Sequence, residues 1–153
     1  MATSITMYSN GNLNSLKALD LSVGGTTNFK VGLVTSAYTP VKTTDTVWAN
    51  ASGSEISNGG YTAGGLGLQN PTLTLTGSTS TFTTATNAVW TASGGSLIAR
   101  YAIIYAVGTF NALVNPLLFY ILMDTTPADV TVTNGNTLTL AWNASGICTW
   151  VSP

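Results

Sequence analysis

The chain has 153 residues, only 6% of them charged, and its four basic and five acidic residues nearly cancel. This length fits one domain, and the scattered basic residues argue against nucleic acid and anionic membrane surfaces as partners. With no His and one Cys, the chain cannot build a Ser/His/Asp or Cys/His catalytic arrangement or an ordinary zinc site. A carboxylate pair or a Lys nucleophile would remain, and five scattered acids favour neither. We therefore expect no enzyme, no cofactor, no metal and no small-molecule substrate.

The first 28 residues differ from the rest of the chain. Residues 1–7 lack the basic start and the long apolar stretch of a signal peptide, so we expect none there. Leu13, Leu16 and Leu19 have the spacing of one helix face, ahead of Gly24 and Gly25. We assign residues 1–28 to an N-terminal arm or short helix and residues 29–153 to a β domain.

The β domain begins with a strand over residues 29–36, which alternates around Gly32. Residues 38–67 are Thr-rich and then Gly-rich, and predict a long, ordered, irregular loop. Glu55 is an isolated acid in this loop, and we expect it to hold the loop in place by accepting backbone N–H bonds. The Gly-rich run over residues 59–67 matches no phosphate-binding pattern and is interpreted as structural.

Alternating residues predict further strands along the chain. Residues 73–76 and 79–84 predict a hairpin across Gly77 and Ser78, with Leu73, Leu75 and Phe82 facing inward. A strand centred on Trp90 follows at residues 88–92. The pair Asn134–Gly135 is a strong turn signal, which predicts a hairpin between residues 130–132 and 137–142. Residues 146–151 form the last expected strand, where the lone Cys148 is interpreted as a small buried apolar residue.

Residues 101–123 carry no charge and have about the length of a membrane-spanning helix. Gly108, Asn111 and Pro116 interrupt the run, and its residues are typical of strands. We interpret it as part of two buried strands, at 97–107 and 117–123, joined by a turn. The first strand should place Tyr101, Ile103 and Tyr105 on one face and Ala102, Ile104 and Ala106 on the other. About eight strands in all predict an all-β fold, an antiparallel, jelly-roll-like β-sandwich.

Two groups of side chains could form a site. Asp45, Glu55, Asp124 and Asp129 show no calcium-loop spacing and are interpreted as loop carboxylates. Trp48, Tyr38 and Tyr61 could stack on sugars. The three other tryptophans fall within strand patterns, so we assign them to the core: Trp90, Trp142 and Trp150.

Four segments together resemble a family of small virion proteins of tailed bacteriophages, and the similarity spans roughly residues 29–150. They are FKVGLVTSAYTP at residues 29–40, Glu55–Ile56 leading to GYTAGG at 60–65, Ala88–Val89–Trp90, and ARYAIIY at 99–105. Members resemble capsid cement or decoration proteins, and the family has no catalytic residues to transfer. Asn87 and Ala106 stand where the family pattern has acidic residues, which puts any acid-dependent contact there in doubt.

The resemblance implies a protein that is made in the cytoplasm of the host bacterium and lies on the outer surface of the phage head, as a homotrimer that bridges subunits of the major capsid protein. The candidate interface residues are Leu13, Leu16, Leu19, Tyr38, Trp48, Glu55 and Tyr61. The alternative is a tail-tip, fibre or adaptor protein with a glycan-binding β-sandwich, and a tail-tube subunit is a third option. Neither nucleic acid nor membrane is an expected partner.

Overall fold

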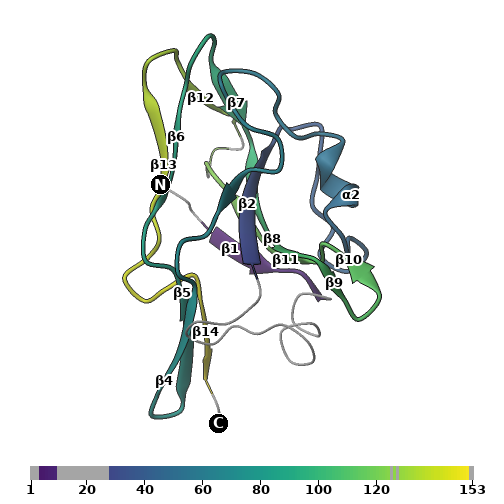
Figure 1. The fold of residues 1–153 in the computed structure, drawn as a ribbon, viewed down its shortest axis with the longest axis vertical. Coiled ribbons are helices and arrows are strands. Elements are labelled where there is room, and N and C mark those ends of the chain that lie inside the picture. Colours follow the sequence, from purple (N-terminus) through teal and green to yellow (C-terminus); the bar gives the residue numbers. More distant parts are fainter. Residues whose placement is uncertain (1–3, 10–27, 125, 127, 152–153) are drawn as a thin grey trace.

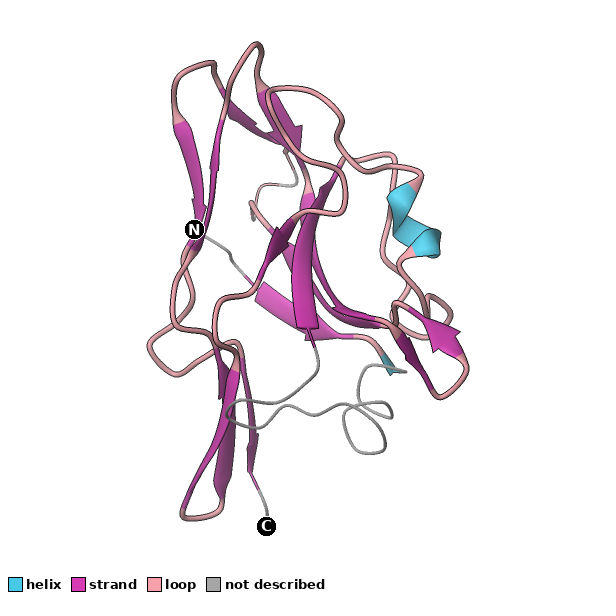
Figure 2. Cartoon of the chain, in the orientation of Figure 1, coloured by secondary structure: helices cyan, strands magenta, loops and turns pink. Residues whose placement is uncertain are grey.

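The computed structural model describes residues 4–9, 28–124, 126 and 128–151, and in these residues the protein is almost entirely β-structure (Figures 1 and 2). Every strand pair is antiparallel, which confirms the all-β prediction. The jelly-roll arrangement stays a prediction. The helix expected around Leu13, Leu16 and Leu19 lies outside the described residues. The arm predicted over residues 1–28 is wrong for residues 4–8, because Ser4–Met7 pair as a strand with residues 119–122 and Tyr8 is fully buried.

The main sheet has five strands in the order β1-β11-β8-β2-β3. Their bounds are β1 Ser4–Met7, β2 Asn28–Val34, β3 Leu66–Gly67, β8 Tyr101–Val107 and β11 Leu117–Leu122. β8 lies at the centre and is buried on both faces, because a different cluster of side chains packs on each side of the sheet. This double burial accounts for the long apolar run at 101–123, and among the described residues no helix is long and apolar enough to cross a membrane.

A second layer lies against one face of the main sheet. We use this name for β4 Thr72–Thr76, β5 Thr79–Thr83, β6 Ala88–Thr91, β7 Leu97–Ala99, β12 Val130–Val132, β13 Thr137–Leu140 and β14 Cys148–Val151. They pair as β14-β5-β4, β13-β6 and β12-β7. Segments 79–99 and 130–151 therefore pair antiparallel in three successive stretches, which follow one another along one side and toward the top of the molecule (Figure 1).

The hairpin predicted between residues 130–132 and 137–142 is wrong. β12 pairs with β7, and β13 pairs with β6. Gly135 has a positive φ of 85°, but its N–H donates to the carbonyl of Ala92, and the Ala92 N–H donates to Asn136. The predicted turn at Asn134–Gly135 does form, closed by the Asn136 N–H donating to the Thr133 carbonyl, but the strands on either side of it pair with β7 and β6 and not with each other.

The strand expected over residues 97–107 divides at Arg100. β7 before it belongs to the second layer, and β8 after it belongs to the main sheet. Arg100 Nε makes a 2.8 Å ion pair with Asp129, which precedes β12 on the returning chain. Bends of this kind explain why the described residues form fourteen strands, including the short β9 Thr109–Phe110 and β10 Leu113–Val114, where about eight were expected.

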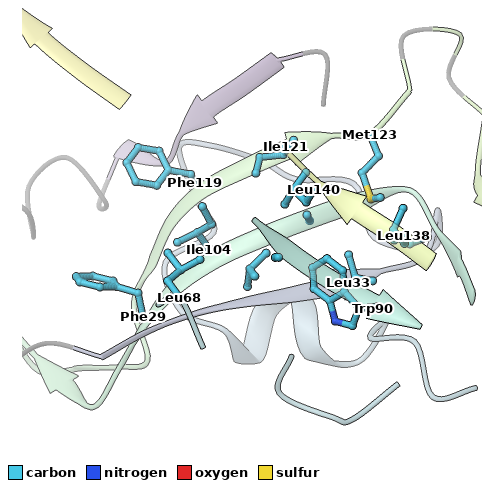
Figure 3. Close-up of a cluster of buried hydrophobic side chains, with 14 of the residues drawn as sticks. Phe29, Leu33, Leu68, Trp90, Ile104, Phe119, Ile121, Met123, Leu138 and Leu140 are labelled. Carbon is cyan, nitrogen blue, oxygen red and sulfur yellow. The ribbon is translucent and has the colours of Figure 1, made fainter. Parts of the chain in front are cut away.

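The larger core fills the space between the two layers. Figure 3 shows Ile104 and Phe119 of the main sheet on one side and Trp90, Leu138 and Leu140 of the second layer across from them. Trp142, Trp150 and half-buried Cys148 pack against this core from its margin. The smaller core lies on the other face of the main sheet, where Ile103 and Tyr105 of β8 pack under the loop of residues 35–65. The predicted alternation of β8 between two faces is therefore confirmed.

One expected core residue is outside the core. The β4–β5 hairpin has the predicted two-residue turn, with Thr76 opposite Thr79, and Phe82 is fully buried. Leu75, predicted to face inward with Leu73 and Phe82, is 71% exposed. Alternation along β4 places Leu75 on the same face as Leu73, but the free end of the hairpin extends away from the main sheet (Figure 1).

Candidate functional site

Glu55 fastens the loop of residues 35–65 to the edge of the main sheet. Its Oε1 accepts a hydrogen bond from the Tyr61 hydroxyl and another from the Gly64 N–H, both at 2.6 Å. The Tyr61 hydroxyl oxygen in turn accepts the N–H of Leu33 in β2 at 3.0 Å. The prediction that Glu55 holds the loop by accepting a backbone N–H is confirmed. Burial and the bond to Glu55 raise the pKa of Tyr61, so its hydroxyl stays protonated and donates.

The Gly-rich run packs against β2. A Cβ on Gly65 would lie 2.0 Å from the carbonyl oxygen of Val31, and Gly65 has a φ of 70°. Tyr105 reaches up from β8 and donates its hydroxyl to the carbonyl of Gly64 at 2.7 Å. Glycine is required because backbone meets backbone here, so the structural interpretation of this run is confirmed.

A second anchor holds the start of the loop. Asp45 Oδ2 accepts the hydroxyl of Tyr38 at 2.7 Å and the N–H of Val41 at 2.8 Å. Since the Tyr38 proton goes to Asp45, the Tyr8 hydroxyl donates to the Tyr38 oxygen, 2.9 Å away. Burial raises the pKa of both phenols. This chain of bonds connects the loop to the residue after β1.

Trp48 lies at the N-terminus of the single-turn helix α2 Ala49–Ser52. Its ring stacks on Tyr105, with centroids 4.6 Å apart and planes 12° apart. Trp48 is 9% exposed and Tyr38 is 7% exposed. Neither ring presents a free face for a sugar to stack on.

Tyr38 and Trp48 belong to the smaller core on one face of the main sheet, whereas Tyr61 packs against the larger core. The structure therefore does not bring the four residues together on one surface, and their polar groups bond within the chain or their rings are covered. Leu13, Leu16 and Leu19 lie outside the described residues. The four aromatic and acidic side chains support the loop, and their arrangement offers no exposed reactive group.

A small cavity of about 230 Å³ lies between β3 and the start of β6. Its lining includes Gln69 and Asn87 and carries no charge. Asn87 Oδ1 already accepts the N–H of Trp142, and Gln69 Nε2 donates to the carbonyl of Gly67. The volume is below the roughly 300–1,000 Å³ of ordinary small-molecule sites. Among the described residues there is also no group of three or more metal-binding side chains.

Within the part of the chain that the structure describes, one layer carries no charged residue, a feature that no single motif indicates. Residues 56–99 and 130–151 contain no Asp, Glu, Lys or Arg, so the second layer is free of charge. Its exposed apolar side chains are Leu75, Val89, Ile98 and Val151. The gap in charge between Glu55 and Arg100 is visible in the sequence, but only the fold shows that both uncharged segments form one layer.

Comparison with known proteins gives no match: no family model, no curated protein and no solved structure matches the chain. The resemblance to phage virion proteins therefore depends on the sequence motifs alone.

Proposed function

We propose that the chain is a capsid cement (decoration) protein of a tailed bacteriophage, which binds the outside of the head and bridges subunits of the major capsid protein. The observation that carries the proposal is the uncharged second layer with its exposed apolar residues. Charged residues are depleted at the centre of protein interfaces, since burying an unpaired charge costs free energy. A broad surface of this kind suits a protein that buries area against neighbours.

The motif residues support the same family. Glu55, Tyr61 and Gly65 hold the long loop on β2, and Trp90 fills the core between the layers. A family that shares these positions would share a fold, and no catalytic step depends on them. This is the pattern expected of a structural protein of the particle.

Binding would stabilise the shell by mass action. A protein that contacts two capsid subunits at once binds the assembled lattice and not the separated subunits, which favours the lattice. At a free concentration one hundred times its Kd, each occupied site stabilises the lattice by about 2.7 kcal/mol. In this proposal three copies form a trimer at a local threefold position, and the segment that contains Leu13, Leu16 and Leu19 reaches a neighbour. Deleting residues 1–20 would also remove β1 and buried Tyr8, so the test is a variant in which Leu13, Leu16 and Leu19 are all replaced by Ser. It should occupy the capsid more weakly while its β domain stays folded, whereas unchanged occupancy would contradict this contact.

The test is localisation on purified particles of the phage that encodes the chain, by antibody-labelled electron microscopy and quantitative mass spectrometry. Hundreds of copies over the head are expected. A few copies confined to the tail would favour a tail-tip, fibre or adaptor protein instead. Absence from particles would overturn both.

Two matched variants test the contact surface. Val89 in the second layer and Val41 in the loop are equally exposed, at 47% and 46%. Val89→Lys should lower occupancy on the head at least tenfold, because a buried unpaired charge disrupts an interface. Val41→Lys should leave it unchanged. Equal loss in both variants, with both folded, would contradict the second layer as the contact surface.

A further inference from the structure

β4 is an edge strand. It ends the three-stranded sheet β14-β5-β4, so among the described strands only β5 pairs with it. Its exposure rises along its length, and Thr74, Leu75 and Thr76 are all exposed. An edge strand presents a row of backbone N–H and C=O groups to any chain that can add to the sheet.

This edge lacks the features that usually prevent such pairing. Thr72–Thr76 contains no charged residue and no Pro, and its five pairs with β5 continue in one regular register, without a bulge. Charges, prolines and bulges are the common means by which edge strands avoid pairing with other molecules. β4 is therefore open to an added strand.

The sequence of β4 identifies the partner. The strand reads Thr-Leu-Thr-Leu-Thr, which is the same in both directions. When two such strands pair antiparallel about Thr74, each Thr lies opposite a Thr, and Leu75 lies opposite the partner's Leu73. All Leu side chains then share one face and all Thr side chains the other. A second copy of this chain therefore matches the edge at every position.

Burial and charge favour the same partner. Leu75 is 71% exposed, and the partner's Leu73 would cover it. Near the axis of a twofold contact, each side chain lies close to the same side chain of the partner copy, so a charged residue there would meet a like charge. β4, β5 and β14 contain no charged residue.

We propose that β4 is a twofold contact between two copies of the chain, which joins their three-stranded sheets into one sheet of six strands. This contact does not depend on the proposed place on a phage head. In a trimeric cement protein it would be a separate interface that links one trimer to the next.

The experiment measures self-association of the full chain by sedimentation velocity over a range of concentrations. Thr74→Lys and Thr74→Glu each place two like charges opposite one another at the centre of the contact, so each variant alone should dimerise at least about tenfold more weakly than the wild type. An equimolar mixture should recover the dimer, because Lys then faces Glu. Recovery is specific to a strand that pairs with itself at Thr74.

Thr149 provides the matched control. It lies in the same cross-strand row as Thr74, through Thr81, but on the opposite edge strand, β14, and it is also exposed. Thr149→Lys should leave dimerisation unchanged. Circular dichroism and urea unfolding of each variant confirm that it is folded.

Three results would overturn the proposal. The first is a wild-type chain that stays monomeric at all concentrations. The second is dimerisation insensitive to both Thr74 variants. The third is association weakened by Thr149→Lys and restored by mixing it with Thr74→Glu, which would assign a head-to-tail contact between β14 and β4. If the chain forms a trimer that neither Thr74 variant weakens, the twofold contact at β4 is contradicted but the cement proposal is not.

Discussion

Gly32 provides the space that the indole of Trp48 occupies. A Cβ on residue 32 would lie 2.5 Å from Cη2 of Trp48, with two more ring carbons at 3.1 and 3.2 Å. The indole also stacks on the ring of Tyr105. β2 can accept the indole only at a position where the strand has no side chain. The glycine within a strand is thus explained by packing.

We predict that Gly32→Ala destabilises the protein by about 1–3 kcal/mol, the usual cost of overpacking a filled core. Gly53→Ala is the control, since Gly53 has a φ of −64° and no atom within 4 Å of its added Cβ. That variant should be neutral or more stable by about 0.4–1 kcal/mol, because alanine restricts the unfolded chain. Urea unfolding measures both, and equal effects would contradict the contact.

Glu55 supports a second prediction. Glu55→Ala removes the acceptor of the Tyr61 hydroxyl and the Gly64 N–H, and should cost about 2–3 kcal/mol. Glu55→Gln keeps one acceptor oxygen and should cost about 1 kcal/mol less. Asp124→Ala serves as the control, because Asp124 accepts local hydrogen bonds from Thr126, two residues away, and the change should cost only a few tenths of a kcal/mol. Similar losses for Glu55→Ala and Asp124→Ala would show that Glu55 does not anchor the loop.

The sequence predicted local geometry well. Alternation assigned the two faces of β8, and Gly77–Ser78 placed the turn of the β4–β5 hairpin. Both signals depend on residues within a few positions of one another. The role of Glu55 was also predictable, because a lone acid in a Gly-rich loop has backbone N–H groups as its nearest donors.

Long-range relationships were not predictable in this way. A turn signal at Asn134–Gly135 indicates a change of direction, but which strands pair depends on segments 31 to 52 residues away. Alternation gave the face of Leu75 but not the point where the opposing sheet ends. Trp48 was expected to be available to a ligand, and its burial depends on Gly32 and Tyr105, which belong to other strands.

A third prediction concerns the β9–β10 hairpin. Phe110 pairs with Leu113, so Asn111 and Ala112 form a two-residue turn with φ values of 49° and 62°. Asn tolerates this left-handed region, whereas Ala pays roughly 1–2 kcal/mol for it. Ala112→Gly should therefore stabilise the protein by about 0.5–1 kcal/mol after the greater entropy of glycine in the unfolded chain is included. Thermal unfolding measures the change.

The control for the hairpin is Ala141→Gly. Ala141 is exposed and does not have a positive φ, so glycine relieves no strain there and should destabilise the protein by about 0.4–1 kcal/mol. A loss of stability in Ala112→Gly as well would contradict the strained turn.

The last prediction is a loss of stability at high pH. Burial, helped by the charge of Glu55, raises the pKa of Tyr105 to about 12, whereas a tyrosine in the unfolded chain titrates near pH 10. Between pH 10 and 12 the unfolded chain therefore releases a proton that the folded chain keeps, so the free energy of unfolding falls as pH rises. Below pH 10 this group contributes its full stabilisation. The raised pKa values of Tyr8, Tyr38 and Tyr61 act in the same direction.

Tyr105→Phe separates this contribution from the others. The variant loses the bond to the Gly64 carbonyl and should be less stable at pH 8 by about 1 kcal/mol. Its stability should then decline less steeply than that of the wild type between pH 10 and 12, because one fewer phenol keeps its proton in the folded state. Urea unfolding at intervals from pH 8 to 12 gives both slopes. Identical slopes would mean that Tyr105 titrates alike in the folded and unfolded chains, and that the charge of Glu55 does not reach it.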